Sequence, residues 1–139
     1  MSSFTAVDPD QRGIGLQDAV RVLAGMREGS PLADLIVHCL LASSEPRESV
    51  DFDVLSAMTW LLPMVPGYTT SPVHARGLAI RRGVRIDVRA TSEGWSSVGW
   101  MPDAGREAGA VEVGAASEAL SLCICTAALH ARRPQPAAA

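Results

Sequence analysis

The stretch GVRIDVRATSEGWSSVGW, residues 83–100, decides the fold class of this chain. In its first half, apolar and charged side chains alternate in the order Val84, Arg85, Ile86, Asp87, Val88, Arg89. Alternation with a period of two residues predicts an antiparallel strand with one buried face. The next segment, TSEG at 91–94, is a turn signal, and WSSVGW at 95–100 predicts the following strand. The stretch therefore predicts a β-hairpin.

Further strands are predicted on both sides of this hairpin. Upstream, GLAIR at 77–81 also alternates and leads into the hairpin through Arg82 and Gly83. Downstream, VEV at 111–113 predicts a short closing strand after the Gly-rich loop MPDAGREAGA at 101–110. We therefore expect an antiparallel meander of three to four strands.

Helices are predicted before and after the meander. We expect them at 15–26, from Ser30 onward, at 51–62, and from Ser117 to Arg132. Ser30 is a favoured N-cap and Pro31 is preset for the first helical position. Asp51 is a second expected cap, and Pro63 ends the third helix. The predicted order is α-α-α-β-β-β-β-α, an α+β layered sandwich of helices on an antiparallel meander.

Length and composition place these elements in one domain. The chain has 139 residues, of which 47% are apolar and 19% charged, so it is long enough and apolar enough to bury a core. We expect a flexible N-terminal arm at 1–15, a single α+β domain at 16–133, and a flexible tail at 134–139, because the chain ends are polar or rich in proline and alanine.

The charge and the cysteines exclude several classes of protein. The net charge of -3 makes nucleic acid an unlikely partner, although all twelve basic residues are arginine. Three cysteines are an odd number, and residues 1–15 do not resemble a signal peptide, so a disulfide framework is not expected. No stretch approaches eighteen apolar residues, which argues against a membrane span. We expect a cytoplasmic protein.

Cys123 and Cys125 in the last predicted helix raise the question of a metal or thiol site. Residues two apart on a helix point about 200° away from each other, so these thiols cannot hold one ion together. The C-x-x-C spacing of redox and zinc pairs is absent. Cys123 shares an apolar stripe with Leu120 and Ile124 and is expected in the core, whereas Cys125 is expected to face away, partly exposed. The sequence predicts no metal site.

Catalysis has no support from the remaining residues. His38, His74 and His130 are scattered along the chain. A His38–Cys39 or His74–cysteine nucleophile pair has no pattern in its favour, and the sequence contains none of the common nucleotide-binding, hydrolase or metalloprotease motifs. We therefore predict no catalytic residue, no cofactor and no enzymatic activity.

Arginine and tryptophan near the hairpin provide the candidate binding residues. They are Arg81, Arg82, Arg85, Arg89, Trp95 and Trp100. Arginines beside an exposed tryptophan can bind a phosphate, a nucleotide or an acidic protein surface. Trp95 and Trp100 are five residues apart on one strand, so they point to opposite faces and only one of them belongs to such a surface. The alternative is an ordinary solvated face on which Asp87 and Glu93 neutralise part of the charge.

Several segments in order resemble one family. They are MREGSPLADLIVHCLLA (26–42), SVDFDVLSAMTWLLPMVPGYTTS (49–71), WSSVGW (95–100) and GAASEALSLCICTAALHAR (114–132). Over residues 26–133 the chain resembles small phage and prophage proteins of the phage ABA sandwich domain type. It departs from that pattern at Ser117-Glu118, where Thr-Pro is usual, and in an enlarged hairpin expected at 74–82. The resemblance implies a phage origin and helices packed on an antiparallel sheet, and it supplies no catalytic residue.

These observations together predict a function in the cytoplasm of a bacterial host. The expected protein is a non-enzymatic phage or prophage accessory protein that binds a host or phage protein, for example as an inhibitor of host machinery or defence. One alternative is a protein that sequesters an anionic nucleotide through Arg85 and Arg89. Another is a structural or assembly component of the virion. A homodimer formed through an exposed edge strand is also open.

Overall fold

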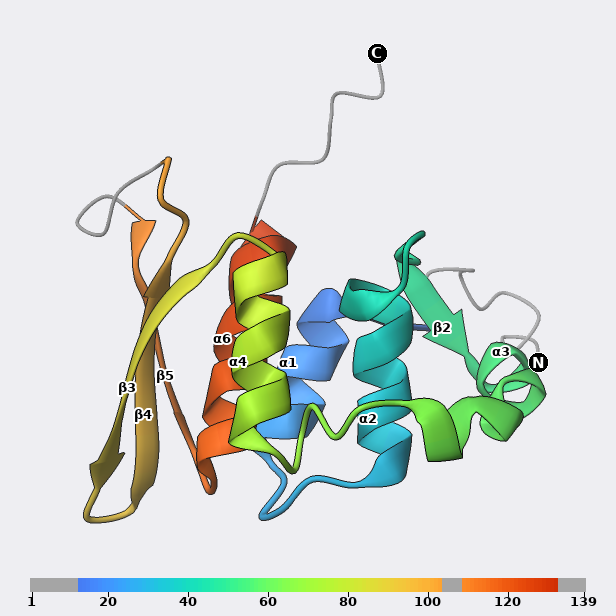
Figure 1. The fold of residues 1–139 in the computed structure, drawn as a ribbon, viewed down its shortest axis with the longest axis horizontal. Helices are drawn as coiled ribbons and strands as arrows, with labels where there is room; N and C mark the ends of the chain where they lie inside the picture. The colour runs from blue at the N-terminus through green and yellow to red at the C-terminus, as the bar shows by residue number, and fades with distance from the viewer. Residues whose placement is uncertain (1–12, 104–108, 133–139) are drawn as a thin grey trace, which may run out of the picture.

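The protein has an α+β fold, which a computed structural model describes over residues 13–103 and 109–132 (Figure 1). The elements are β1 (Gly13–Gly15), α1 (Leu16–Ala24), α2 (Pro31–Val37), η2 (His38–Ala42), β2 (Ser49–Asp51), α3 (Phe52–Ala57), η3 (Thr59–Met64), α4 (Pro72–Arg81), β3 (Arg85–Thr91), β4 (Gly94–Trp100), β5 (Val111–Ala115) and α6 (Glu118–Arg132). The segment η2 is a π-helical turn that continues α2, and η3 is a 3₁₀ helix.

The hairpin predicted from the alternating stretch is confirmed. Strands β3 and β4 pair antiparallel from Arg85 opposite Trp100 to Thr91 opposite Gly94, across a two-residue turn. Strand β5 pairs antiparallel with β4, from Trp95 opposite Ala115 to Gly99 opposite Val111. The three strands form one meander in the order β3-β4-β5.

Helix α6 lies at the centre of the molecule. It packs against the inner face of the β3-β4-β5 sheet on one side and against α4 and α1 on the other, and α2 lies beyond α1 (Figure 1). Its residues from Ala119 to Ala127 are consequently all buried. The other face of the sheet, the outer face, has no described element over it (Figure 1).

A second, two-stranded sheet lies at the opposite end of the molecule. Gly13–Gly15 pairs antiparallel with Ser49–Asp51, and Ile14 lies opposite the buried Val50. Residues 13–15 therefore belong to the folded domain, which corrects the predicted boundary of the arm at residue 15. Residues 1–12 and the predicted tail at 134–139 lie outside the described residues, as do residues 104–108 of the predicted loop.

The predicted strand at 77–81 is wrong, because these residues form the C-terminal half of helix α4. The hydroxyl of Ser71 caps this helix by accepting a hydrogen bond from the backbone N–H of His74, and Pro72 occupies its first turn. Ala75, Leu78 and Ala79 are buried at helical spacing. The enlarged hairpin expected at 74–82 is therefore absent, and the predicted order α-α-α-β-β-β-β-α is corrected to a fourth helix followed by three strands.

The predicted third helix is also divided. Asp51 caps α3 as expected, accepting a hydrogen bond of 2.8 Å from the N–H of Val54. The helix ends at Ala57, and the chain continues as η3, which includes Pro63. Pro63 has no backbone N–H, so one donor is missing from this 3₁₀ segment.

Candidate functional site

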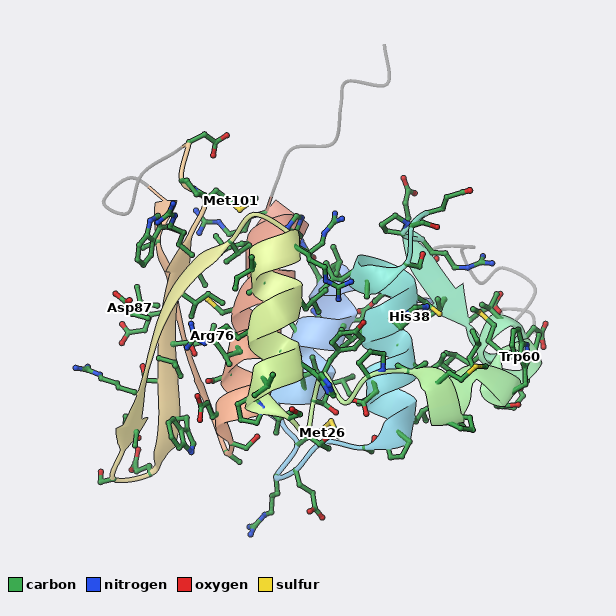
Figure 2. All side chains as sticks on the ribbon, viewed as in Figure 1. Met26, His38, Trp60, Arg76, Asp87 and Met101 are labelled. Carbon is green, nitrogen blue, oxygen red and sulfur yellow. The ribbon has the colours of Figure 1, made fainter. Side chains whose placement is uncertain are left out.

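The outer face of the sheet carries two of the predicted arginines and one tryptophan. Residues directly opposite each other in an antiparallel pair point to the same face. The register therefore assembles the outer face from Arg85, Asp87, Arg89, Ser96, Val98, Trp100 and Glu112. Figure 2 shows Asp87 on the side of the sheet that points away from the helices. This is the candidate binding face.

Charge on this face is mixed and exposed. Arg85, Asp87 and Arg89 are exposed, and Trp100, opposite Arg85, is half-buried. A strand rises about 3.4 Å per residue, so Arg85 and Arg89 lie roughly 13 Å apart along β3 with Asp87 between them. The face therefore offers two separated guanidinium groups and an aromatic ring, an arrangement suited to an extended surface with acidic groups.

Arg81 and Arg82 do not join this face, which corrects their prediction as strand residues. Both lie at the C-terminal end of α4. The guanidinium of Arg81 donates a hydrogen bond of 3.3 Å to the hydroxyl of Tyr68. The backbone carbonyl of Arg82 lies 3.0 Å from Nε2 of His130. These arginines connect α4 to its neighbours, and only two of the four predicted arginines lie on the outer face.

Trp95 points to the inner face and is separated from Trp100, as the spacing of the two residues predicts. It lines an open cleft of about 730 Å³ beside β5, together with Met26, Glu93 and Val113. Nothing in the sequence predicts this cleft. No local pattern connects Met26, in the loop after α1, with a strand nearly seventy residues later, so no sequence signal could have identified it.

The three cysteines are all buried. Burial raises the pKa of the Cys125 thiol to about 12. It also raises the pKa of Cys123, with a further contribution from the negative charge of Asp34, and the pKa of Cys39, where Arg47 opposes the shift. A thiol in this environment is not a ready nucleophile at neutral pH. The predicted partial exposure of Cys125 is wrong because α6 is covered on all sides.

Serine substitutions at Cys123 and Cys125 should lower the stability of the protein to different extents, because the two thiols have different surroundings. Cys123 donates a hydrogen bond of 2.8 Å to the carbonyl of Tyr68, which a serine hydroxyl can retain, so Cys123→Ser should cost about 1 kcal/mol of stability. Cys125 packs among Ala79, Val84 and Leu129, with the carbonyl of Val111 3.8 Å away, so Cys125→Ser should cost about 2 kcal/mol. Urea unfolding of both variants measures the difference. Equal losses, or a Cys123→Ser variant that loses partner binding at unchanged stability, would contradict this assignment.

The three histidines occupy separate positions. His38 lies on η2, where burial and the positive charge of Arg81 lower the pKa of its imidazole. His74 accepts a hydrogen bond of 3.1 Å from the N–H of Gly67. Cys39, next to His38 in sequence, directs its thiol to Met58, with the two sulfur atoms 3.6 Å apart. The structure therefore gives no support to the His38–Cys39 pair.

In residues 13–103 and 109–132, no group of three or more histidine, cysteine, aspartate or glutamate residues could hold a metal ion. Within the same ranges, no helix has the length and apolar character needed to cross a membrane.

The fold and the outer face define an α+β domain with an open sheet. In comparisons with protein-family models, with curated proteins and with solved structures, nothing matched this chain. The resemblance to the phage ABA sandwich type stays a prediction from sequence.

Proposed function

We propose that this protein is a non-enzymatic phage or prophage accessory protein that binds a host or phage protein through the outer face of its sheet. The observation that supports the proposal is the grouping of Arg85, Arg89 and Trp100 on a sheet face with no described element over it. The phage origin rests on the sequence resemblance. A cytoplasmic location and inhibition of host machinery or defence belong to the same proposal.

The composition of the face favours a protein partner. Arginine and tryptophan are the residue types most enriched among binding hot spots. Trp100 is half-buried, so part of its side chain is exposed on this face. Flanking charges of both signs suit a specific protein surface with acidic groups.

The anionic nucleotide is a weaker candidate. Arg85 and Arg89 would have to share one phosphate group across the carboxylate of Asp87, which lies between them on the same face. A carboxylate in that position repels a phosphate, and the roughly 13 Å between the arginines exceeds the reach of a bidentate clamp. If the protein bound an anionic nucleotide, its melting temperature would rise when the nucleotide is added. If its partner is a protein, the nucleotide should leave the melting temperature unchanged.

A pull-down from a bacterial host lysate with matched variants tests the proposal. The wild type should retain a partner at low and moderate salt, and the double variant R85A/W100A should lose it. Truncating a hot-spot residue costs about 2 kcal/mol or more, so the double variant should bind at least about 30-fold more weakly.

The matched control is R27A/W60A, which removes one arginine and one tryptophan from other parts of the surface. Arg27 is exposed in the loop after α1, and Trp60 is 66% exposed at the end of the molecule opposite the sheet (Figure 2). The control should retain the partner. Failure of the wild type to recover any stable partner, or equal binding by both variants, would overturn the proposal.

A further inference from the structure

Strand β3 forms one edge of the sheet. Its seven residues pair with β4 on one side without interruption, and within the described part of the chain no strand pairs with its other side. Natural proteins protect sheet edges with short strands, proline, bulges, charged side chains, inward-pointing charges or a covering helix or loop. Arg85–Thr91 is seven residues long and has no proline or bulge, and Ile86, Val88 and Ala90 point inward. Its charged side chains alternate in sign along the strand, so they favour a strand of complementary charge. This edge can accept another strand.

The backbone groups at this edge follow from the hairpin. In a two-residue hairpin the flanking pair, here Thr91 and Gly94, exchanges both backbone hydrogen bonds, and such pairs alternate along the ladder. The N–H and C=O groups of Arg85, Asp87 and Arg89 therefore face β4. Those of Ile86, Val88 and Ala90 face the free edge.

The sequence of β3 is complementary to itself in one antiparallel register. Centred on Val88, two copies of the strand pair all seven residues and set Asp87 of each copy opposite Arg89 of the other. The edge-facing groups of Val88 then meet those of the second Val88, as a hydrogen-bonded ladder requires. A register centred on Asp87 would instead oppose two aspartates, with Arg85 against Arg89. Opposite charges directly across a ladder stabilise it, and like charges destabilise it.

Helix α4 supports the same association. It contacts β3, and both lie toward the viewer in Figure 1. Val73 and Ile80 of α4 are 78% and 69% exposed, on the side of the helix opposite its buried residues. A two-fold axis midway between the two Val88 residues, perpendicular to the sheet, would keep the helices of both copies on one face. The two α4 helices would then flank the junction with these apolar side chains between them.

We propose that two copies of this chain associate through the free edge of β3, in the register centred on Val88, to form a continuous six-stranded sheet. The proposal does not depend on the partner proposed above. Its consequence for the outer face is that two sets of Arg85 and Trp100 would lie on one surface, related by the two-fold axis.

Two charge reversals test the register. In a dimer of Asp87→Arg chains, arginine would lie opposite arginine at two symmetric positions. In a dimer of Arg89→Asp chains, aspartate would lie opposite aspartate. Each variant alone should therefore dimerise at least about tenfold more weakly than the wild type. An equimolar mixture of the two variants restores opposite charges in both pairs. Sedimentation equilibrium of the full chain should therefore show a wild-type dimer, two weakened variants, and a heterodimer in the mixture.

Recovery of the heterodimer also shows that both variants are folded. Val88→Pro should also weaken the dimer, because it removes an N–H that faces the free edge and spares the ladder with β4. A wild type that stays monomeric at high micromolar concentration would overturn the proposal. So would single variants that dimerise as well as the wild type, or a mixture without heterodimer. An Arg89→Asp variant with undiminished dimerisation would refute the register centred on Val88.

Discussion

The variant Asp34→Ala is expected to lower the free energy of unfolding by about 3 kcal/mol. Asp34 is 7% exposed and accepts two hydrogen bonds from Thr69, one of 2.7 Å from its backbone N–H and one of 2.6 Å from its hydroxyl. Thr69 is fully buried, so removal of the carboxylate leaves two polar groups without this acceptor. This contact fixes α2 to the loop before α4.

Urea unfolding of Asp34→Ala, Thr69→Ala and the double variant measures this interaction as a double-mutant cycle. Asp53→Ala is the matched control, because Asp53 also lies in the first turn of a helix but is exposed. We expect the control to change stability by less than about 0.5 kcal/mol. Strictly additive losses for Asp34 and Thr69 would show that the contact contributes no coupling energy.

Gly29→Ala is expected to destabilise the protein to a similar extent, by about 3 kcal/mol. A Cβ atom at Gly29 would collide with the backbone carbonyl and the side-chain hydroxyl of Thr69. The same hydroxyl accepts a hydrogen bond of 3.1 Å from the N–H of Ser30, so the loop cannot withdraw without losing that bond. The strain comes from close approach of two chain segments.

Gly77→Ala is expected to have the opposite effect, and thermal unfolding measures both glycine variants. Gly77 lies inside α4, and a Cβ atom there meets nothing within 4 Å. Alanine in a helix interior is more favourable than glycine by about 1 kcal/mol, so this variant should melt at a higher temperature than the wild type. If Gly29→Ala and Gly77→Ala had equal effects, the close approach at Thr69 would not be a constraint in solution.

Local signals in the sequence predicted much of the fold. The caps at Ser30, Asp51 and Ser117 were correct because a side chain that bonds the first turn of a helix acts within three residues. The hairpin was correct because its alternation extends over a full strand. The alternation at 77–81 was too short to decide between strand and helix, and the cap at Ser71, which resembles that at Ser30, was the better signal.

Contacts between distant segments account for what the sequence did not reveal. The shared face of Arg85, Arg89 and Trp100 depends on alternation and pairing of adjacent strands, and could be derived from sequence. Burial of Cys125 depends on α6 having the sheet on one side and helices on the other, which no periodicity within α6 indicates. The cleft at Trp95 likewise depends on tertiary packing alone.

The central position of α6 also determines when the chain can fold during its synthesis. Helix α6 is the last described element in the chain, yet it contacts α1, α4 and all three strands of the larger sheet. While residues 118–132 are still inside the ribosome, the elements that have already emerged lack α6 to cover their apolar faces. We therefore expect native structure to form only after release of α6, with a ribosome-bound chain ending before residue 118 held by chaperones or degraded.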